Sequence, residues 1–275
     1  MDSSHTLTDL EAERLRAFID TPCLYTSELP DGTPIFHTSA TEGIAPEYCP
    51  VEYRGLRFGH IAEAWFSAWL SCQNRYRAVV ENLQVIVDGK TLGELDYLLQ
   101  DSSSGEIWHV ELAYKIYLLR PDREGQWQGP NERDSLQRKL KKLREKQLPL
   151  LHQEACRKML MQIGLDVQDI RQAVCLKGQL FVPQAYEGAL SDGVNHEAVV
   201  GSWMGAEQAV QGLRPGETYA FPDKRDWVMP PRMDYHWVDK ARAERFLRKQ
   251  SEQGIACLCW VKDGEGNLRR FIALP

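Results

Sequence analysis

The sequence predicts an α/β protein whose core runs in the order helix, three-strand meander, helix, strand. Three observations predict this order. An aromatic-rich helical stripe comes first, apolar segments around short turns follow it, and a lysine-rich helix precedes one more apolar strand. We expect an N-terminal helical lead over residues 1–56, the core over 57–182, and an α+β appendage over 183–275 that extends the core.

The elements before the predicted sheet are helical. The spacing of apolar residues from Leu7 to Ile19 predicts a helix that ends before Pro22. Residues 26–55 are rich in Pro, Gly and Thr, which predicts a connecting loop. Glu63 lies in the next helix, off its main stripe but on a partly apolar face. That stripe consists of Phe58, Ile61, Trp65, Trp69, Cys72 and Tyr76.

The predicted meander has its strands at 83–87, 93–100 and 107–119, with a turn at Asp88-Gly89 between the first two. In the third strand the even positions from Trp108 onward are apolar or aromatic, whereas every acidic, basic or histidine side chain is at an odd position. Alternate side chains point to opposite faces, so these acidic, basic and histidine groups share one face.

The loop between the second and third strands determines which residues meet. An even-length loop pairs Asp101 with Glu106 and therefore places Asp96 opposite Glu111. Opposed Cβ atoms are about 4.5–5.5 Å apart, so two carboxylates there repel each other. Three compensations are open: a raised pKa on one carboxyl, a basic neighbour such as Lys115, or a divalent cation bound by both. Because magnesium prefers oxygen ligands, we favour the metal, with Lys115 close by.

The second long helix of the core is basic on most of its surface. Lys139, Lys142 and Lys146 lie on this basic face, and Gln147 falls within the apolar stripe, where a buried amide requires a hydrogen-bond partner. Pro149 is expected to end the regular helix. The remaining predicted elements are a short helical stretch, a strand or hairpin at 171–182, a helix at 239–250 and a hairpin at 255–274.

Bulk properties restrict the class of protein. The formal charge of −6 over 275 residues indicates no global preference for nucleic acid, so such binding requires local basic clusters. Seven cysteines without a CxxC pair favour a reducing cytoplasm. No run of about 18 apolar residues occurs, so we expect no membrane span.

The segments "GELDYLL", "WHVELAYKIYLL" and "GPNERDSLQRKL" carry a resemblance. Their order, with acids in the second and third strands, resembles the PD-(D/E)XK nuclease superfamily over roughly residues 57–182. More narrowly, they look like an uncharacterised bacterial domain-of-unknown-function family grouped with those nucleases. The resemblance implies a restriction-endonuclease-like core.

It also implies roles for residues of the predicted site. Asp96 and Glu111 become catalytic ligands of Mg²⁺ or Mn²⁺, and Glu63 becomes a third metal ligand. Lys115 becomes the catalytic lysine, although the usual motif position is Ala113, two residues earlier on the same face. Gln147 is similar to a glutamine that some nuclease branches place beside the metal, and Lys139, Lys142 and Lys146 are expected to contact the phosphates of DNA or RNA.

Three functions remain open at this stage. The first is a metal-dependent nuclease that hydrolyses phosphodiester bonds of DNA or RNA. The second is a catalytically inactive nuclease-fold module that binds nucleic acid or a protein partner, which Ala113 keeps open. The third is an enzyme of unrelated chemistry that uses the same acids for metal binding. For the acids and the helix lysines, the alternative to a functional role is an ordinary solvated charge. For His109 it is a structural histidine that a neighbour satisfies.

Overall fold

The computed structural model describes residues 9–39, 58–123, 127–190 and 193–275. The chain forms two compact units, which are described separately. The first unit takes the described residues within Met1–Tyr114, Gln137–Gly178 and Asp192–Asn195. The second takes those within Lys115–Leu136, Gln179–Ser191 and His196–Pro275.

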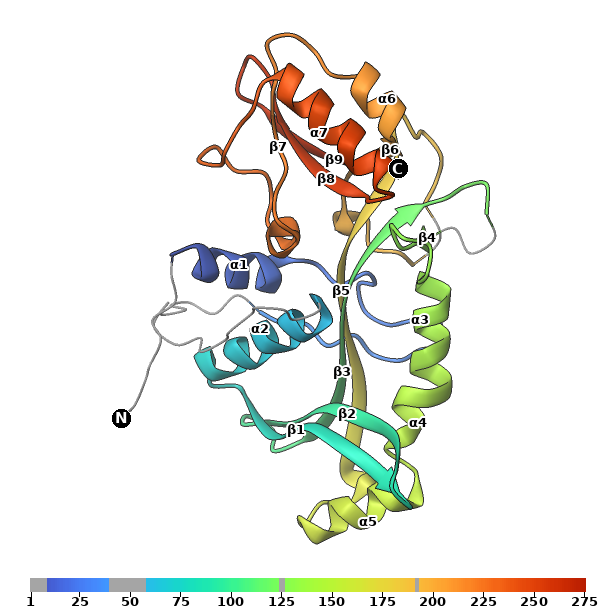
Figure 1. The fold of residues 1–275 in the computed structure, drawn as a ribbon. Coiled ribbons are helices and arrows are strands. Elements are labelled where there is room, and N and C mark those ends of the chain that lie inside the picture. Colours follow the sequence, from blue (N-terminus) through green and yellow to red (C-terminus); the bar gives the residue numbers. More distant parts are fainter. Residues whose placement is uncertain (1–8, 40–57, 124–126, 191–192) are drawn as a thin grey trace. The chain divides into compact units, whose positions relative to one another are not determined.

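The first unit contains most of the helices that flank the predicted site (Figure 1). Its elements are α1 (Asp9–Asp20), α2 (Phe58–Cys72), β1 (Tyr76–Val87), β2 (Lys90–Asp101), the start of β3 (Ile107–Leu119), α3 (Leu136–Lys142, from Gln137), the π-helical turn η1 (Leu143–Gln147), α4 (Leu148–Leu150), α5 (Glu154–Gln162), the 3-10 turn η2 (Val167–Asp169) and most of β5 (Ile170–Pro183).

The second unit contains the C-terminal parts of β3 and β5, and the helices and strands that follow β5. Its further elements are β4 (Trp127–Gln128), η3 (His196–Ala198), β6 (Val199–Gly205), α6 (Ala206–Gln211), β7 (Thr218–Ala220), η4 (Lys224–Val228), α7 (Lys240–Glu252), β8 (Cys257–Lys262) and β9 (Leu268–Leu274).

The strands of the described residues form a mixed sheet of nine strands, in the order β1-β2-β3-β5-β6-β9-β8-β7 with β4 beside β3. The β1-β2 and β2-β3 pairs are antiparallel, as are β8-β9 and β7-β8, whereas β5-β6 and β6-β9 are parallel. The predicted α/β class is therefore confirmed. Asp88 and Gly89 both have positive φ, 49° and 74°, as the predicted two-residue hairpin turn requires.

The first core helix is shorter than its apolar stripe predicts. It ends at Cys72, and Tyr76 instead begins β1. Gln73 ends the helix, because its Oε1 accepts the amide hydrogens of Arg75 (2.7 Å) and Tyr76 (2.8 Å). Its Nε2 donates to the carbonyl oxygen of Leu70 at 3.3 Å. The apolar spacing alone missed this polar stop signal.

The helix 136–150 also departs from the prediction. It continues to Leu150 but passes through the π-helical turn Leu143–Gln147. Pro149 has no amide hydrogen to donate to the carbonyl of Glu145, so one α-helical hydrogen bond is missing there. Because that bond is already lost, the wider π-helical turn costs less. Farther along, β5 is one continuous strand and not a hairpin, since Lys177 and Gly178 pair with the segment around Cys23.

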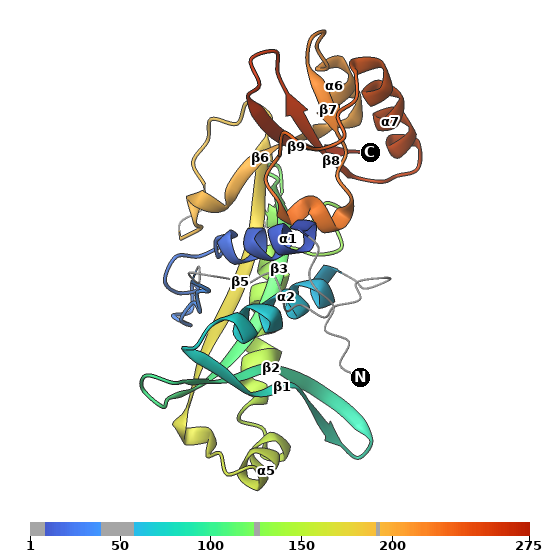
Figure 2. The ribbon, with the colours of Figure 1, turned by 90° about the vertical axis from the view of Figure 1, so that its left-hand side faces the viewer.

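Aromatic side chains form the core of the first unit on one face of β2 and β3. α1 and α2 lie over this face, and the helix 136–150 lies over the other (Figures 1 and 2). Phe66 of α2 packs 4.6 Å from the ring of Tyr97, and Phe18 of α1 packs 5.7 Å from Trp65. Both faces of the central hairpin are thus covered, and the helix 136–150 lies over the polar face that carries the predicted site.

The second unit confirms the predicted helix and hairpin near the chain end as α7 and β8-β9. Its core includes Tyr219, Leu247 and Cys259. The brief elements β6, α6 and β7 were not predicted, because short segments carry little periodicity. Among the described residues, no helix has the length and apolar character needed to cross a membrane.

Candidate functional site

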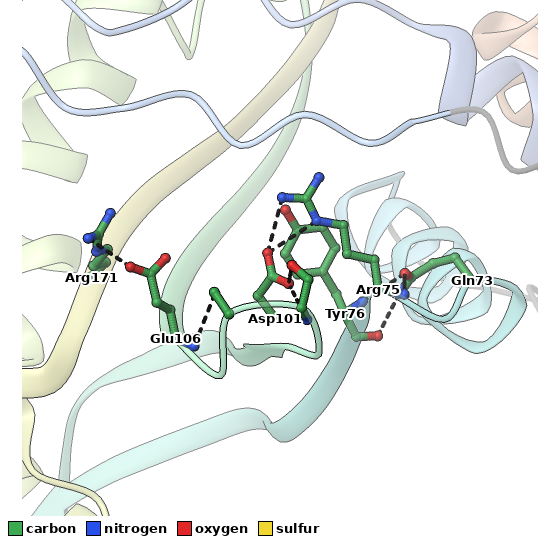
Figure 3. A network of polar contacts seen from close by, with 8 residues as sticks. Gln73, Arg75, Tyr76, Asp101, Glu106 and Arg171 are labelled. Carbon is green, nitrogen blue, oxygen red and sulfur yellow. Dashed lines mark hydrogen bonds and ion pairs between the residues drawn. The ribbon is translucent and has the colours of Figure 1, made fainter.

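The loop between β2 and β3 fixes the register of the predicted acid pair. The Asp101 amide donates to the carbonyl of Glu106 at 2.9 Å, as predicted. The Asp101 carboxylate accepts the amide hydrogen of Ser103 at 2.8 Å and two guanidinium hydrogen bonds from Arg75 at 3.1 Å each (Figure 3). Glu106 forms an ion pair with Arg171 at 2.7 Å. These contacts fix the conformation of the loop and therefore the pairing of Asp101 with Glu106.

The observed register agrees with the prediction. Leu98 pairs with His109 and Tyr97 with Val110, which is the last regular pair of the ladder. Asp96 and Glu111 follow directly in the same register, and the Asp96 carboxylate accepts the backbone hydrogen of Leu112 at 2.8 Å. A side chain thus replaces a backbone acceptor at the position of the acid pair.

Glu111 is fully buried, and both of its oxygens accept hydrogen bonds. His109 Nε2 lies 3.0 Å from Oε1, and the Gln147 amide donates to Oε2. Gln147 belongs to the π-helical turn, so this turn supplies the partner that the buried amide required. A carboxylate without water depends on such donors, because desolvation is costly.

His109 is also fully buried, and Gln172 on β5 orients its ring. The amide nitrogen of Gln172 lies 2.9 Å from His109 Nδ1 and donates to the carbonyl of Leu148 at 2.8 Å. With an amide donor facing Nδ1, the neutral imidazole carries its hydrogen on Nε2, toward Glu111. Sequence reasoning left His109 outside the site and gave no signal for Gln172. The spacing of His109 two residues before Glu111, on the same strand face, was the available clue.

Asp96 carries much of the electrostatic cost of the pair. Burial and then repulsion from Glu111 raise the pKa of Asp96 from 3.8 to about 7. The bond from Leu112 and the positive charge of Lys139 oppose this rise, and Glu63 adds to it. Two of the three open compensations therefore operate in the described structure, a raised pKa and a basic neighbour. That neighbour is Lys139.

Lys139 was expected on the exposed basic face, and this prediction is wrong. Its side chain is buried, and Nζ donates to Gln147 Oε1 at 2.9 Å. It turns inward because the buried acids and the amide attract its charge, whereas Lys142 and Lys146 remain exposed as predicted. The chain Lys139–Gln147–Glu111 thus joins the helix to β3 through side chains.

Lys115 and Glu63, which were also predicted to belong to the site, have partners other than Asp96 and Glu111. Lys115 belongs to the second unit, where its Nζ forms an ion pair with Asp134 at 2.6 Å. Glu63 lies on α2, and its carboxylate is 3.2 Å from His60 Nδ1. The carbonyl of Glu63 accepts the Tyr97 hydroxyl at 3.0 Å. In the part of the chain that the structure describes, no group of three or more acidic, histidine or cysteine side chains could hold a metal ion.

One protein-family model matches most of the chain. A family model described as "Domain of unknown function (DUF1853)" matches residues 45–269. The chain belongs to the DUF1853 family. No curated protein and no solved structure matches it. All the residues of the acid site described above fall within the DUF1853 match, from Glu63 to Gln172.

The residues of this DUF1853 site are compatible with a divalent ion, although their present contacts compete with it. Mg²⁺ commonly takes one or two protein carboxylates and completes its coordination with water and phosphate oxygens. Asp96 and Glu111 could supply two such ligands. Because the oxygens of Glu111 already accept from His109 and Gln147, an ion would have to share or replace one of these donors.

Proposed function

We propose that this protein is a metal-dependent phosphodiesterase acting on nucleic acid, with Asp96 and Glu111 holding Mg²⁺ or Mn²⁺. The observation that supports it is that Asp96, partly buried, lies close enough to the fully buried Glu111 for their charges to repel, with the buried Lys139 close enough to offset them. Like charges in such a position are costly and are typical of functional sites. The resemblance to PD-(D/E)XK nucleases assigns the same chemistry to acids in the second and third strands.

Each residue of the site has a proposed role. The bound ion would polarise the scissile phosphate and lower the pKa of a water molecule. Asp96 and Glu111 bind the ion, His109 and Gln147 orient Glu111, and Lys139 balances negative charge from the phosphate. Lys139 therefore takes the role that the resemblance assigned to Lys115. Glu63, from the other face, contributes through its charge and is not proposed as a ligand.

Exposed cations on the helix 136–150 support nucleic acid as the substrate class. They are Arg138, Lys141, Lys142, Arg144 and Lys146. Arg144 is paired with Glu145 at 3.2 Å, so the exposed lysines Lys142 and Lys146, which were predicted to contact phosphates, are the better probes. If they contact phosphates, each substitution by alanine should lower the salt dependence of binding by about one unit in the log–log slope.

The test is a cleavage assay on single- and double-stranded DNA and RNA with Mg²⁺ or Mn²⁺. We expect cleavage by the wild type, loss of cleavage in Glu111→Gln and Lys139→Met, and retention in Glu94→Gln. Glu94 is a matched control, since it lies on the same strand two residues before Asp96. A folded wild type that cuts none of these substrates with either metal would refute the proposal.

A second candidate function is a nuclease-fold module without turnover. The specific observation in its favour is that the protein itself satisfies both oxygens of Glu111. For such a module, the wild type should bind oligonucleotides in a salt-dependent way and cut none of them. Glu111→Gln should then leave binding unchanged, whereas Lys142→Ala should weaken it.

A further inference from the structure

A single amide group connects the two residues whose side chains hold Glu111. Gln172 lies on β5, which is the neighbour of β3 in the sheet. Its nitrogen is 2.8 Å from the carbonyl oxygen of Leu148 and 2.9 Å from His109 Nδ1. His109 contacts one oxygen of Glu111, and Leu148 directly follows Gln147, whose amide donates to the other oxygen. The Gln172 amide therefore holds both of the elements that supply donors to this acid.

The Leu148 carbonyl determines which way the Gln172 amide points. A carbonyl oxygen only accepts, so the atom of Gln172 that faces it is the nitrogen with its two hydrogens. One hydrogen goes to Leu148, and the other is directed to His109 Nδ1, which accepts it. The hydrogen of the neutral His109 ring is consequently on Nε2, 3.0 Å from Glu111 Oε1. Each hydrogen of the amide thus holds a different donor of Glu111.

The carbonyl of Leu148 is available to Gln172 because the helix ends here. In a regular α-helix this carbonyl accepts from the amide four residues later, which is that of His152. The His152 amide instead donates to the carbonyl of Pro149 at 3.1 Å. The bond from Gln172 takes the place of the missing one. It ties the residue that follows the π-helical turn to the sheet, and Gln147 is the last residue of that turn.

We propose that Gln172 is a positioning residue of the acid site, which sets the orientation of Glu111 although its amide hydrogens bond neither acid. The arrangement of donors around Glu111 follows from the contacts alone, whereas its effect on a bound ion rests on the proposed function. A metal ligand binds well when its partners hold it in one orientation, and loss of such a partner commonly weakens metal binding by about 10–100-fold. The affinity of the acid pair for an ion is therefore set partly from β5.

The alternative is that Gln172 only stabilises the fold, and Gln179 provides a matched control for that role. Gln179 lies on the same strand, is buried, and donates through Nε2 to the carbonyls of Trp227 at 2.8 Å and Val228 at 3.1 Å. It belongs to the second unit and lies seven residues after Gln172, roughly 23 Å farther along an extended strand. Gln179→Met therefore removes comparable amide hydrogen bonds that have no connection to Glu111.

The first measurement is Mn²⁺ binding to the full chain by titration calorimetry, with thermal unfolding to check that each variant is folded. Methionine is about as long as glutamine and has no hydrogen to donate. We expect Gln172→Met to bind Mn²⁺ about 10–100-fold more weakly than the wild type, and Gln179→Met to stay within about twofold of it. Equal affinities in the wild type and a folded Gln172→Met, or equal losses in both variants, would overturn the proposal.

The second measurement needs no metal. A long-range ¹H–¹⁵N correlation spectrum of ¹⁵N-histidine protein at about pH 8, where a histidine is ordinarily neutral, shows which ring nitrogen of His109 carries hydrogen. His109→Gln identifies the signal. We expect the hydrogen on Nε2 in the wild type. In Gln172→Glu we expect hydrogen on Nδ1, because a carboxylate accepts and cannot donate.

The two measurements separate this inference from the proposed function. Hydrogen on Nδ1 in the wild type, or a bare Nδ1 in a folded Gln172→Glu, would overturn the role of Gln172. The wild-type spectrum gives this answer even if a variant does not fold. A wild type that shows hydrogen on Nε2 and binds no Mn²⁺ would refute the metal site and still support Gln172 as the residue that positions the donors of Glu111.

Discussion

The raised pKa of Asp96 makes a signed prediction about stability. A carboxyl whose pKa is higher in the folded than in the unfolded protein binds its proton more tightly when folded. Its contribution is complete below pH 3.8 and is lost as pH rises through about 7. Each pKa unit corresponds to about 1.4 kcal/mol, so the ionised form costs up to about 4 kcal/mol at pH 8.

Asp96→Asn removes this cost, because the amide is uncharged and its oxygen can still accept the hydrogen bond from Leu112. We expect the variant to have a higher free energy of unfolding than the wild type at pH 8, by up to about 4 kcal/mol, and a similar one near pH 4. The measurement is urea unfolding followed by tryptophan fluorescence in the presence of a chelator. Added Mn²⁺ should stabilise the wild type and leave the variant unchanged, if the acids bind the ion.

Asp101→Asn is a control of opposite sign on the same strand. Hydrogen bonds from Ser103, and then from Arg75, lower the pKa of Asp101, so its ionised form is the favoured one. Its contribution is present above pH 3.8, and the asparagine variant should be less stable than the wild type at pH 8. A loss of stability in Asp96→Asn at pH 8, similar to that in Asp101→Asn, would show that the acid pair is not repulsive and would refute the reasoning.

Further predictions concern packing and buried charge. Lys139→Ala should destabilise the protein by about 3–5 kcal/mol, because it leaves buried acids without their ammonium partner, whereas Lys142→Ala should change stability by less than about 0.5 kcal/mol. Equal effects in chemical denaturation would contradict the buried position of Lys139. Gly201→Ala should cost about 1–3 kcal/mol, because its new Cβ would lie 2.6 Å from the carbonyl oxygen of Arg270. Gly264→Ala, which meets nothing within 4 Å, is its control, and matching thermal midpoints would count against this contact.

Much of the first unit could be predicted from local patterns. The third strand was predicted at Ile107–Leu119, and the structure has those bounds. The register of Asp101 with Glu106 followed from loop length and alternation, which act over a few residues. The helix end at Cys72 was missed, because it depends on side-chain hydrogen bonds from Gln73, to which an apolar pattern is blind.

The acid site shows where such reasoning stops. Period-two alternation was enough to place Asp96 and Glu111 on one face, but it could not say which cation would meet them. Lys115 was preferred because it is near in sequence, on the same strand. The cation that offsets the acids is Lys139, which lies more than 20 residues after Lys115. It reaches them because the helix 136–150, with its π-helical turn, packs over that face of the sheet.

The amino-acid sequence by itself determined the α/β class, the central hairpin and the opposition of two carboxylates, because strand alternation and turn length are local properties of the chain. The tertiary structure decided the partners of these carboxylates: His109, Gln147 and Lys139 close around them, and Gln172 comes from a separate strand. Such contacts depend on how segments distant in sequence pack together. A buried carboxylate needs hydrogen-bond donors in place of water, and the packing of the helix 136–150 and of β5 supplies them.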